Sequence, residues 1–172
     1  MKENDAEKAH GKIRRAELRD IPAIDRLLYE VQKVHSDARG DLFIVGGRKY
    51  TDDELSYIIR DERRPTFVFD DGGKVLGYIF CEHKQLTGST SMTDIRTLYI
   101  DDLCVDEAAR GRHIGTELYN SVLKYAGEHG YYNVTLNVWA GNENALKFYR
   151  SLGMRVQKFG MEKILDTGDK KY

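Results

Sequence analysis

The stretch "DEAARGRHIGTELY", residues 106–119, places two arginines and two glycines directly before an amphipathic run. The first turn of a helix normally favours acidic residues, because the helix macrodipole is positive there. In this stretch Arg110 and Arg112 flank Gly111, and Gly115 lies in the first turn. An anionic ligand would complete such a turn, since glycine leaves backbone N–H groups accessible and arginine adds charge-assisted hydrogen bonds. The alternative is a solvated basic loop.

The composition is that of one globular domain with mixed charges. The chain has 172 residues and a formal net charge of −1. A chain of this length can bury a hydrophobic core. Because its positive and negative charges balance, it has no extended positive potential that would attract nucleic acid or an anionic membrane. No apolar stretch has the length of a membrane span or a secretory signal, and neither Cys81 nor Cys104 belongs to a disulfide framework. We expect a cytoplasmic protein with one domain over residues 13–166 and polar tails at 1–12 and 167–172.

Two helices are predicted in the first third of the chain. Asp20 caps the first helix, which has Pro22 in its first turn and apolar residues at helical spacing. The second helix begins with capping-box spacing between Thr51 and Glu54. It should end before Pro65, because the residue that precedes a proline disfavours the helical conformation.

The strand at residues 94–105 carries an irregularity. Its apolar alternation runs through Leu98 and Ile100 and resumes at Leu103 and Val105, a slip of one residue. Because side chains alternate faces along a strand, one inserted residue at Asp101 or Asp102 explains the slip, and we expect a β-bulge there. The other strands are expected at residues 13–18, 66–70, 74–86, 131–139 and 154–165, the last one bent at Gly160.

The order of elements predicts a mixed α/β fold. The helix that begins near residue 114 connects strands 94–105 and 131–139, and a strand–helix–strand unit of this length makes the two strands parallel. The arginine loop then lies at the carboxyl end of the first strand, where open α/β sheets bind ligands. A last helix is expected over residues 142–153.

Two motifs resemble those of the GCN5-related N-acetyltransferase (GNAT) superfamily. "RGRHIG", residues 110–115, is similar to its Q/R-x-x-G-x-G/A loop, with His113 in place of the middle glycine. "NENALKFYRSLGM", residues 142–154, is similar to its N-x-x-A-x-x-x-Y-x-x-x-G-F segment, with Met154 in place of the aromatic residue. The opening, residues 13–28, is similar to the usual first strand and helix.

The resemblance implies a GNAT-like acyl-CoA N-acyltransferase fold, with a central mixed sheet, a splayed parallel strand pair and helices on both faces. It implies direct transfer of acetyl from acetyl-CoA to a primary amine of a small molecule or peptide, with Tyr149 as general acid. Asn142 would contact the cofactor, and the backbone of Leu103, Cys104 and Val105 would pair with its pantetheine arm. The pyrophosphate would lie on the loop formed by Arg110, Gly111, Arg112, His113, Ile114, Gly115 and Thr116.

Several roles remain open at this level. Tyr149 is either the acid or an ordinary core aromatic residue. His113 either keeps a helical conformation, alters the approach of the cofactor or donates to a phosphate. The general base is one of four residues, or all four are structural: Glu82, His83, Asp101 and Asp102.

The acceptor and the partners are equally open. Residues 35–50 and 86–94 would line the acceptor pocket, with "DLF" (41–43) and Tyr50 as candidate contacts. The histidines lack metal-ligand spacing, so we expect no metal. A homodimer could form through strand edges or the final segment. The alternatives to an enzyme of this family are a non-catalytic acetyl-CoA sensor and an unrelated phosphate-binding enzyme.

Overall fold

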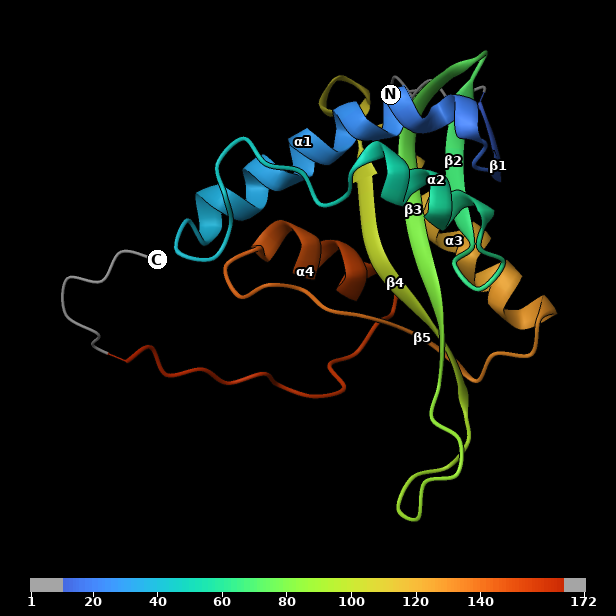
Figure 1. Ribbon diagram of the computed structural model, residues 1–172, viewed down its shortest axis with the longest axis vertical. Coiled ribbons are helices and arrows are strands. Elements are labelled where there is room, and N and C mark those ends of the chain that lie inside the picture. The colour runs from blue at the N-terminus through green and yellow to red at the C-terminus, as the bar shows by residue number, and fades with distance from the viewer. Residues whose placement is uncertain (1–10, 166–172) are drawn as a thin grey trace, which may run out of the picture.

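Five strands form one sheet in the order β1-β2-β3-β4-β5 (Figure 1). The computed structural model of the chain describes residues 11–165. Neighbouring strands are antiparallel except β4 and β5, which are parallel as predicted. The strands are β1 (Lys12–Arg15), β2 (Thr66–Asp71), β3 (Lys74–Gln85), β4 (Arg96–Val105) and β5 (Asn133–Leu136).

In the part of the chain that the structure describes, four α-helices and two short 3-10 helices accompany the sheet. They are η1 (Leu18–Asp20), α1 (Ile21–Ala38), α2 (Asp52–Arg60), η2 (Glu107–Ala109), α3 (Ile114–Glu128) and α4 (Glu143–Ser151). The predicted capping box of α2 is confirmed, because Thr51 Oγ1 accepts from Glu54 N and Glu54 Oε2 accepts from Thr51 N. Asp20 occupies the N-cap position of α1, but its carboxylate accepts hydrogen bonds from Arg14 and from Glu17 N instead of capping the helix.

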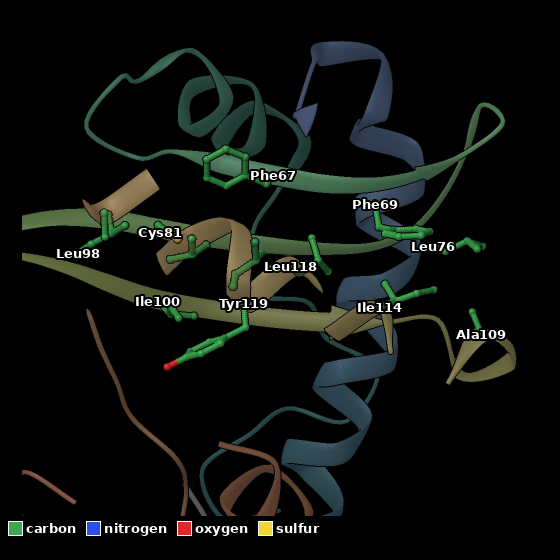
Figure 2. Packing of buried hydrophobic residues seen from close by; sticks show 13 residues of the cluster. Phe67, Phe69, Leu76, Cys81, Leu98, Ile100, Ala109, Ile114, Leu118 and Tyr119 are labelled. Carbon is green, nitrogen blue, oxygen red and sulfur yellow. The ribbon is translucent and has the colours of Figure 1, made fainter. Parts of the chain in front are cut away.

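Each face of the sheet is covered by its own helices. Helices α1 and α2 pack on one face, where Tyr78 and Phe80 of β3 join Leu27 and Leu28 of α1 in a buried cluster. Helix α3 packs on the other face, and α4 adds partly buried residues there. Figure 2 shows this second cluster, with residues of β2, β3 and β4 directed toward α3; its labelled members are Phe67, Phe69, Leu76, Cys81, Leu98, Ile100, Ala109, Ile114, Leu118 and Tyr119.

The predicted bulge is confirmed at Asp101. Phe80 of β3 pairs with Asp102 and the next residue, Cys81, pairs with Ile100, so Asp101 has no opposite residue. The inserted residue shifts the alternation of side chains after Ile100 by one position. The apolar side chains of β4 before and after the bulge therefore face the same packed side of the sheet.

Some predicted boundaries are wrong. The final segment, residues 154–165, forms no strand, and β1 and β5 are shorter than expected because they end at Arg15 and Leu136. Lys12, assigned to the N-terminal tail, belongs to β1. The rest of that tail before Gly11, and the whole C-terminal tail, lie outside the described residues.

Candidate active site

The parallel strand pair opens beside the bulge. Strands β4 and β5 pair from Thr97 and Asn133 as far as Ile100 and Leu136, and pairing stops there although β4 continues to Val105. Within residues 11–165 the last part of β4 therefore has a strand on its β3 side only. Bulges commonly end pairing in this way and are frequent near active sites.

The backbone of β4 points into this opening at two residues. Asp106 N donates to Leu76 O, on the β3 side, at 2.9 Å. Because successive residues of an antiparallel strand direct their N–H and C=O groups to opposite edges, those of Val105 and Leu103 face the open side. The side chain of Cys104 faces α1 instead, with Sγ 3.5 Å from Leu27 O, and burial raises the pKa of its thiol to about 12. A thiol held protonated in this way is unsuited to carrying an acyl group.

A run of free backbone donors lies at the start of α3. Arg110 N donates to Glu107 O and Glu117 N donates to His113 O. Between them, the amides of residues 111–116 have no acceptor in the part of the chain that the structure describes. Four unpaired amides are ordinary at a helix start, and the preceding loop adds two more. The arrangement suits an anion with several oxygens.

Glycine occurs at positions 111 and 115 of this loop for different structural reasons. Gly111 has φ +83°, a left-handed conformation that a side chain disfavours. Gly115 allows α3 to approach α4, because a Cβ atom there would lie 3.3 Å from Phe148 Cζ. His113 has φ +61° and is the one non-glycine residue within 11–165 with positive φ. The loop therefore keeps the left-handed conformation of the missing glycine rather than the helical one.

The two loop arginines are in different states. Arg112 Nη2 forms an ion pair of 2.9 Å with Oδ2 of Asp71, the last residue of β2. Arg110 is exposed and forms no ion pair with any residue in 11–165. The two arginines appear equivalent in the sequence. In the structure Asp71 compensates the charge of Arg112, so only Arg110 has its full charge available to a ligand.

Tyr149 lies on α4 with its ring against the core. Its ring centroid is 5.1 Å from that of Phe148 and 6.2 Å from that of Tyr119, which lies at the edge of the cluster in Figure 2. Burial, followed by the negative charge of Asp102, raises the pKa of the Tyr149 phenol well above its ordinary value. The phenol is therefore protonated at neutral pH, which is the state a proton donor requires. Asn142 caps α4, since its Oδ1 accepts from Ala145 N at 3.1 Å.

The two bulge carboxylates differ sharply in their surroundings. Asp101 accepts a hydrogen bond of 2.6 Å from Tyr50 Oη and forms an ion pair of 2.9 Å with Lys49 Nζ. Asp102 accepts a hydrogen bond of 2.8 Å from Tyr78 Oη and has no salt-bridge partner within 11–165. Desolvation raises the pKa of Asp102, and the charge of Lys49 opposes the shift without cancelling it.

The other two candidate bases lie away from the opening. Glu82 and His83 pair with Tyr99 and Leu98, where β4 and β5 are still joined. Glu82 faces solvent beside Lys84, and its distance to the Lys84 ammonium is 3.6 Å. Burial and the nearby charges of Arg96 and Arg63 lower the pKa of His83.

Three aromatic side chains connect the elements beside the opening. His35 at the end of α1 stacks on Phe43, with ring centroids 4.9 Å apart, and Phe43 meets the edge of Trp139 at 5.2 Å. Trp139 follows β5, so this contact joins the loop between α1 and α2 to the segment that continues from β5 after its pairing with β4 has ended. Burial lowers the pKa of His35, whereas the charge of Asp102 opposes that shift.

Sequence patterns assigned no individual role to His35 or Lys49, which lie in the stretch 35–50 predicted to line the acceptor pocket, and did not single out Tyr78. These residues reach the bulge from α1, from the loop after it and from β3, and no local motif marks them. Tyr50, a candidate acceptor contact, does reach the site through Asp101. Within residues 11–165 no group of three metal-ligating side chains gathers, and no helix has the length and apolarity for crossing a membrane.

A model of the acetyltransferase (GNAT) family matches residues 31–154. The matched range includes the bulged strand, the arginine loop and Tyr149. The chain belongs to the GNAT acetyltransferase family. The mixed sheet with its parallel β4–β5 pair confirms the fold class that the two motifs implied.

Relatives of this GNAT chain include proteins of known structure. The chain is 34% identical to a tetramutant of the BH1408 protein from Bacillus halodurans, with a TM-score of 0.85 over 90% of this chain and 99% of that one. An aminoglycoside acetyltransferase from a soil metagenomic sample has a similar fold, with 20% identity and a TM-score of 0.68 over 90% of this chain and 96% of that one.

The name of one curated relative includes the activity N-acetyltransferase. The chain is 29% identical over 99 residues to the uncharacterized N-acetyltransferase MJ1207 of Methanocaldococcus jannaschii. The match covers 58% of this chain and 42% of MJ1207, so the chain spans less than half of that relative's length.

Proposed function

We propose that this GNAT protein transfers an acetyl group from acetyl-CoA directly to a primary amine of a small molecule or peptide. One observation carries the proposal: the open edge of β4 and the unpaired amides of residues 111–116 lie at the same end of the sheet. An opening lined by strand backbone accepts an extended amide-containing arm, and the amide loop beside it accepts a diphosphate.

The residues present fit the cofactor in two places. The amides of 111–116 would hold the pyrophosphate, with Arg110 as the free cation and Arg112 held by Asp71. The outward N–H and C=O groups of Leu103 and the outward C=O group of Val105 would pair with the pantetheine arm. Acetyl-CoA supplies the activated thioester when it is bound.

Two groups would stabilise the charge that develops during transfer. The Val105 N–H, which faces the opening, would polarise the thioester carbonyl as an oxyanion donor. Tyr149 would protonate the departing thiolate, and Asp102 and Tyr149 are close enough for the charge of one to raise the pKa of the other. Asn142 would position this helix through its cap and leave its amide nitrogen for the cofactor.

Asp102 is the general base that the surroundings favour. A base must be unpaired and must have a pKa closer to neutrality than an ordinary carboxylate. Asp101 forms an ion pair with Lys49, while Asp102 forms no ion pair with any residue in 11–165 and has a raised pKa. The hydrogen bond from Tyr78 fixes the orientation of the Asp102 carboxylate.

The proposal is tested by assaying a panel of amines with acetyl-CoA, using wild type, Tyr149→Phe and the matched control Tyr119→Phe. We expect acetylation of at least one amine and a loss of turnover of about 10²-fold in Tyr149→Phe, the scale of general acid catalysis. Tyr119→Phe should retain turnover, because its ring packs at the edge of the core.

Three outcomes would contradict the proposal or part of it. Equal turnover in Tyr149→Phe and wild type would remove Tyr149 from the mechanism. Binding of CoA without acetylation of any amine would favour the sensor. Thermal stabilisation by nucleotides and not by CoA would favour an unrelated phosphate-binding enzyme.

A further inference from the structure

A cavity lies at the opposite end of β4 from the candidate active site. Its volume is about 470 Å³, and its walls come from the segment before β2, from β3, from the start of β4 and from the chain between the end of α3 and β5. Arg96 is the first residue of β4 and Val105 the last, so at about 3.3 Å per residue roughly 30 Å separates the cavity from the site. A cavity of this size can hold a small molecule.

The lining of the cavity carries an excess of positive charge. Four of its side chains are basic: Arg63, His83, Arg96 and His129. Within residues 11–165 neither arginine forms an ion pair. The carboxylate in the lining, Glu62, lies 3.7 Å from Arg15 instead, and its side chain is 92% exposed.

The half-buried imidazole of His83 lies among these charges. Burial lowers its pKa first, and the charges of Arg96 and Arg63 lower it further. A bound anion would act in the opposite direction, because a negative charge nearby favours the protonated imidazole. The cavity is therefore in the state expected of an anion site without its anion.

Neighbouring elements hold the two arginines in place. His83 N donates to Arg63 O at 2.7 Å, which joins the segment before β2 to β3. Arg96 Nη1 donates to His129 O at 2.8 Å, and the guanidinium lies 4.8 Å from the ring centroid of Tyr131. A guanidinium has five N–H donors, so Arg96 keeps donors for a ligand. Cations held in this way lose less side-chain entropy when an anion binds.

The remaining wall of the cavity is aromatic. Tyr125 and Tyr131 line it, with ring centroids 6.4 Å apart, and the ring of His83 meets Tyr131 at 5.6 Å. Guanidinium groups bind phosphate oxygens in paired hydrogen bonds, and two of them match a dianion better than a single carboxylate. Aromatic rings beside the cations supply apolar surface for an organic group attached to the phosphate.

We propose that this cavity binds a small phosphate monoester. Arg63 and Arg96 hold the phosphoryl oxygens, and Tyr125 and Tyr131 cover the organic part. The site lies far from the arginine loop and from Tyr149, so the inference does not depend on the proposed acetyl transfer.

The first test is a titration of the full chain with phenyl phosphate, followed by NMR through the imidazole resonances of His83. The titration is run with saturating CoA and repeated with Arg110→Gln, so that binding at the arginine loop does not contribute. We expect a saturable change with a dissociation constant of about 1 mM or below, and a higher pKa of His83 in the complex. Resonances of His83 that stay unchanged, or that respond only in the absence of CoA, would overturn the proposal.

The second test separates a built site from diffuse charge. Arg63→Gln and Arg96→Gln should each weaken phenyl phosphate about 10-fold, the loss of a charge-assisted contact. Arg63→Gln carries this test if Arg96→Gln destabilises the end of α3, because the Arg63 side chain has no hydrogen bond within residues 11–165. Arg19→Gln is the matched control, since Arg19 is 69% exposed beside Glu17, and it should bind like wild type.

Two further ligands test the assignment to a monoester. Phenol should not bind, and inorganic phosphate should bind at least about 3-fold more weakly than phenyl phosphate, because it leaves the aromatic wall uncovered. Equal affinity for inorganic and phenyl phosphate would indicate an adventitious ion only. Equal binding by wild type and Arg63→Gln would remove the proposed site altogether.

Discussion

Arg112 Nη2 lies 2.9 Å from Asp71 Oδ2, and this ion pair ties the loop before α3 to the end of β2. The pair withdraws one of the two loop arginines from any ligand and leaves Arg110 as the available cation. It also explains how a loop with two left-handed residues, Gly111 and His113, keeps one shape. The arginines that appear equivalent in sequence therefore have different tasks.

We expect Arg110→Gln to weaken CoA binding about 10-fold, the loss of one charge-assisted hydrogen bond. Arg112→Gln should weaken it by about 3-fold or less, because that charge is already compensated. Isothermal titration calorimetry at fixed salt measures both, with Arg60→Gln on α2 as the control. Equal losses in the two loop variants would mean that Arg112 releases Asp71 when CoA binds.

His113→Gly should leave CoA affinity within about 2-fold of wild type, because the backbone and not the imidazole forms the cradle. Glycine removes about 1 kcal/mol of left-handed strain but adds a similar entropy to the unfolded chain, so the free energy of unfolding should change by less than about 1 kcal/mol. His113→Val should lower it by about 1–3 kcal/mol, since a β-branched residue resists this conformation. A tenfold loss of affinity in His113→Gly would show that the imidazole contacts the phosphates.

The pH dependence of kcat/KM should report Asp102. Its pKa is raised by desolvation, so the carboxyl stays protonated to a higher pH than an ordinary aspartate, and activity should fall as pH decreases through this raised pKa. Asp102→Asn should lower kcat about 10²-fold or more and remove that limb of the profile. Glu82→Gln is the matched control and should keep the profile of wild type. Any pH dependence that remains in Asp102→Asn belongs to ionisation of the acceptor amine. An unchanged profile would exclude Asp102 as the base.

Arg14 should matter more for stability than any exposed arginine. It donates hydrogen bonds of 2.7 and 2.9 Å to Asp20 and of 2.8 Å to Asp70, joining β1, η1 and β2. Arg14→Leu leaves two buried carboxylates uncompensated and should lower the free energy of unfolding by about 3 kcal/mol in urea titrations. Arg19→Leu, at an exposed pair with Glu17, should change it by less than about 1 kcal/mol.

The same network predicts an acid transition. Burial opposes ionisation of Asp20, but the hydrogen bonds from Arg14 and from Glu17 N, together with the charges of Arg14 and Arg19, outweigh it and hold the pKa of Asp20 below the ordinary value. A separate hydrogen bond from Arg14 lowers the pKa of Asp70. Stability from these groups is therefore complete above the ordinary aspartate pKa of about 4 and is lost as pH falls through the lowered values. Arg14→Leu should flatten this loss, and an acid dependence identical to wild type would contradict the assignment.

The elements predicted correctly are those whose signals are local. The capping box of Thr51 and Glu54, the parallel connection through α3 and the bulge at Asp101 each depend on residues close together in the chain. The final strand was predicted wrongly for a related reason: residues 154–165 have the alternation of a strand, but a strand forms only against a neighbour, and alternation does not say where that neighbour is.

The sequence by itself determined the fold class and the position of the candidate site, because hydrophobic period, caps and motif spacing are encoded in consecutive residues. Only the tertiary structure decided which charges in the site are available. Asp101 and Asp102 are adjacent in the chain, yet Asp101 forms an ion pair with Lys49 and accepts a hydrogen bond from Tyr50, whereas within residues 11–165 Asp102 accepts a side-chain hydrogen bond from Tyr78 only. The difference arises from groups distant in sequence, since charge compensation and desolvation depend on distances in space.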